Sequence, residues 1–238
     1  MSTLTPDAAR RLARLAGFNY LLIFIFAMAA NMGVVMGLEV SGDPAATFDN
    51  ILGQVGALRL AAAAFMVVLV ADVIISAALY FVLRPAGARL SLIAALFRLV
   101  YTAMFSAVAL NFVEILTVIE AGELIPRVEA ASRVYLALNE FQMGFAVSLI
   151  FFAVHLVLLG VLFMRAPYLP GVLGGLLVLS GLGYAADGFG QLLFASYGPF
   201  AVPMMFAVLV PAIIGEGALC LWLLIRGLNP SKWPVEEA

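Results

Sequence analysis

The chain has 238 residues, of which 65% are hydrophobic and 11% are charged, and its formal net charge at pH 7 is -2. Soluble domains carry about 25% charged residues, so this composition excludes an ordinary soluble protein and predicts a helical integral membrane protein. The long continuous apolar runs lack the alternation of a transmembrane β-barrel. No basic patch indicates nucleic-acid binding. The single cysteine, Cys220, excludes an intramolecular disulfide and a thiolate metal cluster, and we interpret it as a small buried side chain.

Six apolar segments are long enough to cross a bilayer, so the sequence predicts an all-α fold: a six-transmembrane-helix bundle that forms a single integral membrane domain. Between residues 45 and 55, apolar residues recur at helical spacing, which predicts a short amphipathic helix on the membrane surface. We expect a polar connection from Glu120 to about Arg133 and a short turn from Ser196 to Pro203. The six segments are about 15–38, 60–83, 90–119, 134–164, 172–195 and 204–225.

The first segment has two possible interpretations. Arg10, Arg11 and Arg14 precede an apolar stretch that contains Ala27-Met28-Ala29, a pattern that also fits a cleavable signal peptide. The apolar run continues past this site to about Leu38, which is membrane length and favours retention of the segment.

Lysine and arginine residues are distributed unequally between the two ends of the predicted helices. Eight lie at the end that carries both termini, three lie at the opposite end, and the remaining one is Arg98. The positive-inside rule then predicts that both termini lie in the cytoplasm. The eight are Arg10, Arg11, Arg14, Arg84, Arg89, Arg165, Arg226 and Lys232.

Arg98 lies in the middle of the third apolar segment, where an arginine costs roughly 2.5 to 3.5 kcal/mol unless other groups satisfy it. Asp72, Arg98, His155 and Glu216 each lie nine to twelve residues from the basic residue at the end of their helix. That offset is about 13 to 18 Å, near the middle of a hydrocarbon core about 30 Å thick. We therefore expect Arg98 to face the bundle interior and to contact Asp72, Glu216 or both, with His155 nearby.

A second group of polar residues lies farther from the basic helix ends. Glu114 and Glu140 are each 25 residues from those ends, so together with Asn111 they predict an outer polar rim that faces water. Asp187 lies between the two layers in apolar sequence, where a carboxylate is costly and often functional. Arg98 and Glu114 point about 160° apart around their helix, so we do not expect one site to hold all these residues.

Glycines are frequent in the fifth segment, and a proline interrupts the sixth. Pro211 lies five residues before Glu216 and predicts a kink beside this acid. The glycines predict close approach of neighbouring helices and not phosphate binding; they are at positions 171, 174, 175, 181, 183, 188 and 190.

Four stretches of the sequence resemble those of a known family. They are Phe97-Arg98-Leu99-Val100-Tyr101, then 152–160 running on to Arg165 and Pro170, then 181–187, and last 211–216 followed by 221–227. In these residues, and in their order along nearly the whole chain, the sequence resembles a bacterial multi-pass membrane family. That family is known only as a domain of unknown function, number four-three-eight-six in its series. The resemblance implies six helices and a location in the bacterial inner (plasma) membrane, and it brings no activity with it.

Three functions remain open. The first is binding or transport of a small molecule or ion at a midplane site of Asp72, Arg98 and Glu216, and six helices are few for a carrier, so a homodimer is expected. The second is a membrane-embedded enzyme acting on a lipid-like substrate, with His155 and either Asp187 or Glu216 as acid and base. The third is an accessory subunit whose buried charges fix helix register. One histidine and no metal-binding motif predict no metal or cofactor.

Overall fold

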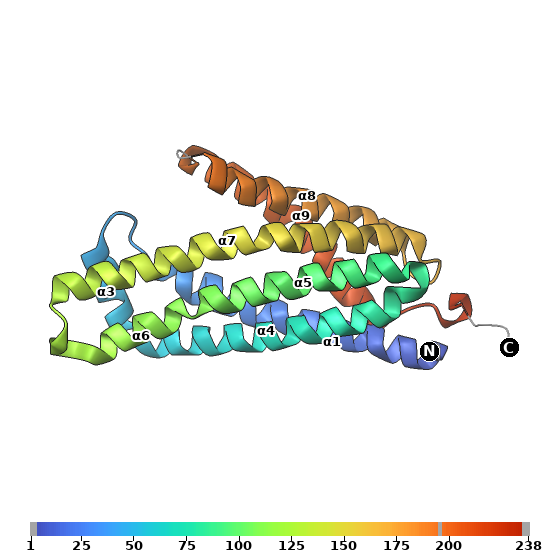
Figure 1. Ribbon diagram of the computed structural model, residues 1–238, viewed down its shortest axis with the longest axis horizontal. Helices are drawn as coiled ribbons and strands as arrows, with labels where there is room; N and C mark the ends of the chain where they lie inside the picture. The colour runs from blue at the N-terminus through green and yellow to red at the C-terminus, as the bar shows by residue number, and fades with distance from the viewer. Residues whose placement is uncertain (1–3, 195–196, 235–238) are drawn as a thin grey trace. The chain divides into compact units, whose positions relative to one another are not determined.

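The computed structural model describes residues 4–194 and 197–234, which form helices and connecting turns with no β-strand. Six of the helices are long and apolar enough to cross a membrane, which confirms the predicted six-span all-α architecture (Figure 1). The helices are α1 (Pro6–Ala30), continued by a π-helical stretch (Asn31–Val35) into α2 (Met36–Leu38), α3 (Pro44–Gly53), α4 (Val55–Leu83), α5 (Ala88–Ala109), α6 (Asn111–Ala121), α7 (Arg127–Arg165), α8 (Gly171–Leu193) and α9 (Gly198–Ile225).

Several helices begin in polar sequence, outside the apolar segments. α1 begins at Pro6, where the missing proline N–H costs nothing, and not at the expected residue 15. α7 begins at Arg127, directly after Pro126, so the polar connection expected from Glu120 to Arg133 is wrong over its second half. Hydropathy alone misses such ends, because helical turns outside lipid need no apolar residues.

Two further boundaries differ from the expected ones. α9 begins at Gly198, so the turn expected from Ser196 to Pro203 is helical over most of its length; Ala195 and Ser196 lie outside the described residues. The third segment consists of two helices, α5 and α6, which meet at Leu110. The Asn111 side chain donates to the carbonyl of Val108 at this break, at 3.0 Å.

The helices divide into two compact units, and α1, α4, α5 and α7 each contribute to both. Unit 1 consists of Met1–Leu21, Ala71–Thr102 and Ala146–Ala238. Unit 2 consists of Leu22–Val70 and Ala103–Phe145. In both units large apolar side chains point outward: Leu60 is 74% exposed and Val172 is 78% exposed. Soluble proteins rarely expose so much apolar surface, so these faces suit contact with lipid.

Unit 2 has an aromatic core and an ion-paired surface. Phe65 packs against Phe105, Phe112 and Phe141, with ring centroids 5.4 to 5.6 Å apart. The short helix α3, predicted from the apolar spacing, is capped by Asp43, whose carboxylate accepts a hydrogen bond from the Ala46 N–H at 2.9 Å. Exposed arginines of this unit pair with acids: Arg59 with Glu120, Arg127 with Asp49 and Arg133 with Glu114.

In unit 1, α1 is fastened along α9. A Cβ at Gly17 would lie 2.3 Å from the backbone nitrogen of Leu224, so the two helices touch where only glycine fits. Arg10 and Arg14 donate to the carbonyls of Arg226 and Ile225 at the end of α9, where a helix has unpaired carbonyls and attracts positive charge. α1 is therefore an integral part of the core of unit 1.

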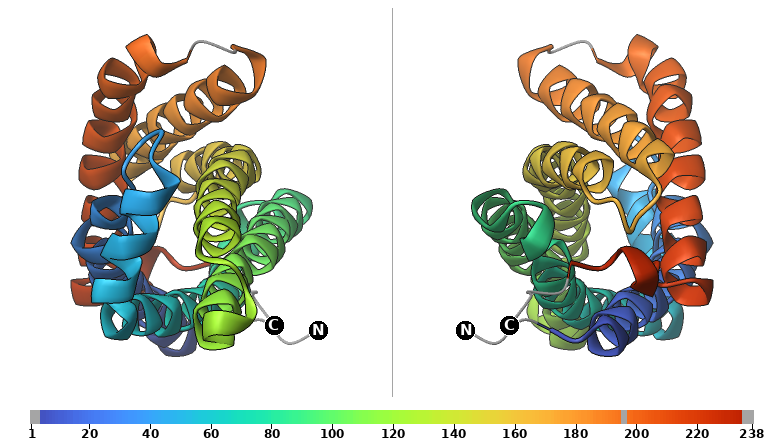
Figure 2. Two further views of the ribbon diagram at one scale, coloured as in Figure 1. Left: turned by 90° about the vertical axis from the view of Figure 1, so that its left-hand side faces the viewer. Right: turned by 90° about the vertical axis from the view of Figure 1, so that its right-hand side faces the viewer.

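Glycines bring α7 and α8 equally close. Gly174, Gly181 and Gly188 recur every seven residues on α8, and a Cβ at each would lie 2.4 to 3.1 Å from an α7 carbonyl oxygen. These carbonyls belong to Gly160, Ala153 and Ala146. The predicted close packing is thus present at these three glycines and wrong for Gly175, where nothing lies within 4 Å of a Cβ. α9 lies beside α8 in both end views (Figure 2).

Two neighbouring glycines of α8 give a matched test of this packing. We expect Gly174→Ala to lower the free energy of unfolding by about 1 to 3 kcal/mol, because the new methyl group forces the α7 backbone away. Gly175→Ala meets no atom and gains helix propensity, so it should stabilise the protein by about 0.4 to 1 kcal/mol. Reversible unfolding in mixed detergent micelles measures both; equal effects would contradict the packing described here.

Candidate polar site around Arg98 and Glu216

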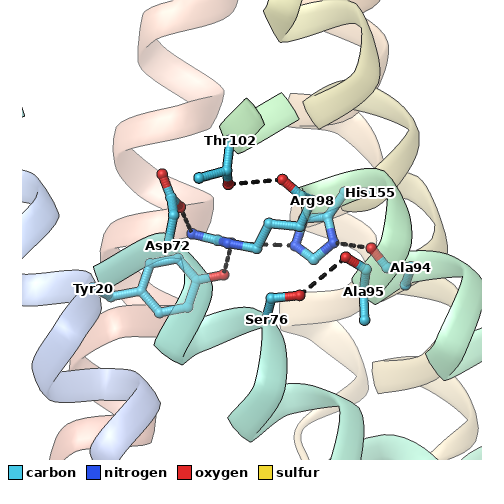
Figure 3. Close-up of polar contacts among 8 residues, drawn as sticks. All are labelled: Tyr20, Asp72, Ser76, Ala94, Ala95, Arg98, Thr102 and His155. Atoms are coloured by element: carbon cyan, nitrogen blue, oxygen red, sulfur yellow. Dashed lines mark hydrogen bonds and ion pairs between the residues drawn. The ribbon is translucent and has the colours of Figure 1, made fainter. Parts of the chain in front are cut away.

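Arg98, on α5, is the largest fully buried side chain of the described residues, with an exposed fraction of 1%. Its Nη2 donates to Oδ1 of Asp72, on α4, at 2.5 Å, in an ion pair as buried as the arginine itself. Its Nη1 donates to the hydroxyl of Tyr20, on α1, at 2.8 Å, and lies 3.2 Å from Nε2 of His155, on α7 (Figure 3). One guanidinium therefore joins four helices of unit 1.

Aromatic rings complete the surroundings of the guanidinium. Its central carbon lies 4.9 Å from the ring centroid of Tyr20 and 5.4 Å from that of Phe152. Such cation–π contacts partly replace the water that an arginine loses on burial. Two buried polar atoms are still without a hydrogen-bond partner in the described residues, Nε of Arg98 and Oδ2 of Asp72.

The hydrogen bonds of His155 define its tautomer. Nδ1 lies 2.8 Å from the carbonyl oxygen of Ala94, which only accepts, so Nδ1 carries the proton. Nε2 is then unprotonated and accepts from Arg98. His155 is therefore neutral, both its nitrogens are engaged, and it adds no positive charge to the site.

Glu216, on α9, is 8% exposed and has a different partner from the one expected. Its Oε1 accepts a hydrogen bond from the hydroxyl of Tyr184, on α8, at 3.1 Å. It lies within electrostatic range of Arg98 and Asp72, but in the part of the chain that the structure describes no arginine or lysine forms an ion pair with it. The expectation that Arg98 contacts Asp72, Glu216 or both is thus met by Asp72 alone.

The site consequently holds one cation and two carboxyl groups. Asp72 balances Arg98 at ion-pair distance, and His155 is neutral. The carboxyl group of Glu216 is left over. A lone carboxylate inside an apolar bundle is costly unless it takes up a proton or a cation.

Asp187 belongs to a second polar cluster at the end of α8. Its Oδ1 accepts from the hydroxyl of Tyr197 at 2.5 Å, and its Oδ2 accepts from Nε2 of Gln191 at 2.9 Å. Tyr197 lies outside the candidate spans, and burial together with the Asp187 carboxylate raises the pKa of this tyrosine. Its hydroxyl therefore keeps its proton at neutral pH. Tyr184, the partner of Glu216, lies one helical turn before Asp187.

The residues expected at the outer rim all lie in unit 2. Glu140 is exposed, and Glu114 is exposed and accepts from Arg133 at 2.6 Å. The side-chain amide of Asn111 donates to the carbonyl of Val108 at the break between α5 and α6.

The tyrosine partners were not predicted from the sequence. Tyr20, Tyr184 and Tyr197 each donate to or receive a hydrogen bond from a predicted charged residue. Charged residues are rare in membrane-spanning segments, so counting residues from the basic helix ends draws attention to them. Tyrosine is common in such segments, so its presence gave no reason to assign it to the site. The signal that was available is spacing: Tyr184, Asp187 and Gln191 lie three and four residues apart and so share one face of α8.

A small pocket lies beside His155, lined by residues of α4, α5 and α7 that include Ser76, Tyr80 and Ser91. The two serine hydroxyls donate to the carbonyls of Ala95 and Tyr80. Among residues 4–194 and 197–234, no three His, Cys, Asp or Glu side chains converge as a metal ion would require.

Comparison with known proteins identifies the family and no activity. A family profile described as "Domain of unknown function (DUF4386)" matches residues 15–227. An uncharacterized protein of Archaeoglobus fulgidus is 31% identical over 165 residues, which are 69% of this chain and 82% of that protein. Because this relative is archaeal, the description of such proteins as bacterial is too narrow. No solved structure matches the chain. With nearly all of its spanning helices inside the matched region, the chain belongs to the membrane-protein family described as Domain of unknown function (DUF4386).

Proposed function

We propose that this protein binds and carries a small ion or solute across the membrane, and that the carboxyl group of Glu216 takes up a proton or cation in each cycle. The observation that carries the proposal is the charge imbalance in unit 1, where a single guanidinium faces two carboxyl groups. Ionisable groups at membrane depth mark ion and substrate pathways far more often than chance.

The two carboxyl groups have different roles in this proposal. Asp72 is held by Arg98 at 2.5 Å and forms a fixed anchor. Glu216 is held only by a neutral hydroxyl, that of Tyr184, and a neutral partner bonds to both the protonated and the ionised acid. Glu216 can therefore alternate between two charge states without breaking the Arg98 network.

The position of Glu216 in the chain also supports this role. It follows Pro211 on α9, and Pro203 and Pro211 both lie inside this helix. Proline removes a backbone hydrogen bond, and interrupted helices commonly form the binding sites of transporters. The carbonyl of Pro211 itself accepts a hydrogen bond from the hydroxyl of Ser180, on α8, at 3.0 Å.

The orientation and assembly are part of the same proposal. The excess of arginine and lysine at the end that carries both termini supports a cytoplasmic position for that end, by the positive-inside rule. Because six helices are few for a carrier, the transporting form would be a homodimer. Labelling of single cysteines introduced beside Arg89 and Glu123, from either side of the membrane, tests the orientation.

The enzyme alternative receives less support. Its acid–base pair required His155 to act with Asp187 or Glu216, but both ring nitrogens of His155 bond to Arg98 and Ala94. The accessory-subunit alternative explains the Arg98–Asp72 pair as a helix lock. It does not explain a second buried carboxyl group without a cation.

Vesicles reconstituted with the purified protein test the proposal. With a pH difference across the membrane and a pH-sensitive dye inside, the protein should speed proton entry over empty vesicles, and Glu216→Gln should abolish the increase. Glu140→Gln serves as the control, because this carboxylate is exposed in unit 2 and should not matter. Equal proton entry with and without the Glu216 carboxyl group would overturn the proposal.

A further inference from the structure

Two polar residues of α8 and one of its connection to α9 lead away from Glu216. Tyr184 donates to Glu216 at 3.1 Å, Asp187 lies one turn farther along α8, and Tyr197 donates to Asp187 at 2.5 Å. Tyr197 belongs to the connection between α8 and α9, at the end of both helices. These three residues therefore run from the buried carboxyl group to the end of the two helices, within unit 1.

Each member of this series can both give and receive a proton. A tyrosine hydroxyl donates one hydrogen bond and accepts others, and a carboxyl group donates when protonated and accepts when ionised. Elsewhere around Glu216, the ionisable groups are engaged with Arg98 or buried. They are Arg98 and Tyr101 on α5, Asp72 on α4, Tyr20 on α1 and, through Arg98, His155 on α7.

We propose that Tyr197, Asp187 and Tyr184 form the path by which a proton travels between Glu216 and the membrane surface at the α8–α9 connection. This inference rests on the proposed function and adds to it: the bound cation is a proton, and it enters from the end of the bundle opposite the termini. Asp187 takes a proton from water through the Tyr197 hydroxyl. A bridging water carries it across the turn to Tyr184.

The transfer balances at every group. Tyr184 passes its own hydroxyl proton to Oε1 of Glu216 and receives another from the bridging water, which Asp187 replenishes. At the end Glu216 has gained one proton, the solvent has lost one, and both tyrosines and Asp187 have returned to their starting states. No oxidant, reductant or metal is needed.

Two hydrogen bonds to Asp187 provide a matched pair of variants. Tyr197→Phe removes the bond to Oδ1 together with a transferable proton, whereas Gln191→Met removes the bond to Oδ2 and no acidic proton. Asp187→Asn removes the carboxyl group and keeps the shape of the side chain. If Asp187 served only to hold α8 against the α8–α9 connection, Tyr197→Phe and Gln191→Met would change the exchange rate of the Glu216 carboxyl group to a similar extent.

Hydrogen–deuterium exchange of the Glu216 carboxyl group, followed by infrared spectroscopy of the full chain in lipid nanodiscs, tests the path. The band is assigned by its loss in Glu216→Gln. We expect Asp187→Asn and Tyr197→Phe to slow its exchange about 100-fold, the lower range for a positioned proton-transfer group, and Gln191→Met to leave the rate nearly unchanged. The band should keep its intensity in all three.

The outcomes separate the two proposals. A Glu216 band that exchanges at an unchanged rate in Asp187→Asn and Tyr197→Phe overturns the path and leaves proton uptake by Glu216 intact. Equal slowing by Tyr197→Phe and Gln191→Met also overturns it, because the effect would then come from the fastening of α8. The absence of any Glu216 band at every pH overturns the proposed function itself.

Discussion

Asp72→Asn lowers the free energy of unfolding by about 3 to 5 kcal/mol, the largest loss expected of any single substitution at the site. Asparagine still accepts a hydrogen bond but leaves the guanidinium of Arg98 without its ion-pair partner. An arginine cannot shed its proton to escape this cost. Reversible unfolding in mixed detergent micelles, with refolded protein as the reference, measures the change.

The control for Asp72→Asn is the same substitution in an exposed ion pair. Asp49 pairs with Arg127 in unit 2, and their side chains are 56% and 64% exposed. Surface pairs of this kind contribute about 0 to 1 kcal/mol, so Asp49→Asn should change stability little. Similar losses from both variants would mean that Arg98 is not buried as described.

Replacing both partners, Arg98→Met with Asp72→Leu, should recover part of the stability that Asp72→Asn loses. Apolar residues of similar volume commonly equal or exceed a buried ion pair in stability, since no charge is left without a partner. Tyr20 and His155 each lose a hydrogen bond to Arg98, at a cost of about 1 to 3 kcal/mol for a group left unsatisfied. The same unfolding measurement compares the three proteins.

The double variant also distinguishes two roles of the Arg98–Asp72 pair, stabilisation of helix packing and participation in proton transport. We expect it to fold and to lose proton entry into vesicles, because the proposed function needs the Arg98–Asp72 anchor beside Glu216. A double variant that folds and still allows full proton entry would show that Arg98 and Asp72 stabilise the fold and have no part in transport. A double variant less stable than Asp72→Asn would contradict the ion-pair argument.

The architecture was predictable because lipid leaves the chain few choices. Backbone polar groups must be satisfied within each spanning segment, so long apolar runs such as 60–83 and 172–195 specify helices almost by themselves. The ends of the helices were less predictable, since the first turns of α7 and α9 lie in sequence that hydropathy assigns to loops. In these two stretches the signal for a helix start was a proline: Pro126, directly before α7, and the proline in the first turn of α9.

The site was predictable in depth but not in detail. Counting residues from the basic ends placed Asp72, Arg98 and His155 in one layer, and the structure brings these three into contact. Depth says nothing about rotation around each helix, which is why the choice between Asp72 and Glu216 stayed open. Rotation depends on packing, here on the glycine contacts of α8 with α7 and of α1 with α9.

The first segment shows how the structure adds to the sequence. Its pattern also fits a signal peptide that would be cleaved after Ala29. Cleavage there would remove Tyr20 from Arg98 and Gly17 from α9. Retention of the segment stays a prediction, and in the structure the segment supplies both of these contacts to unit 1.

The most direct test of the central claim is the steady-state infrared spectrum of the protein in lipid nanodiscs between acid and alkaline pH. The claim is that the second carboxyl group beside Arg98 takes up a proton. We expect one protonated-carboxyl band, from a site shielded from water, that disappears as the pH rises, is absent in Glu216→Gln and persists in Glu140→Gln. A spectrum in which Glu216→Gln leaves every such band in place would contradict it.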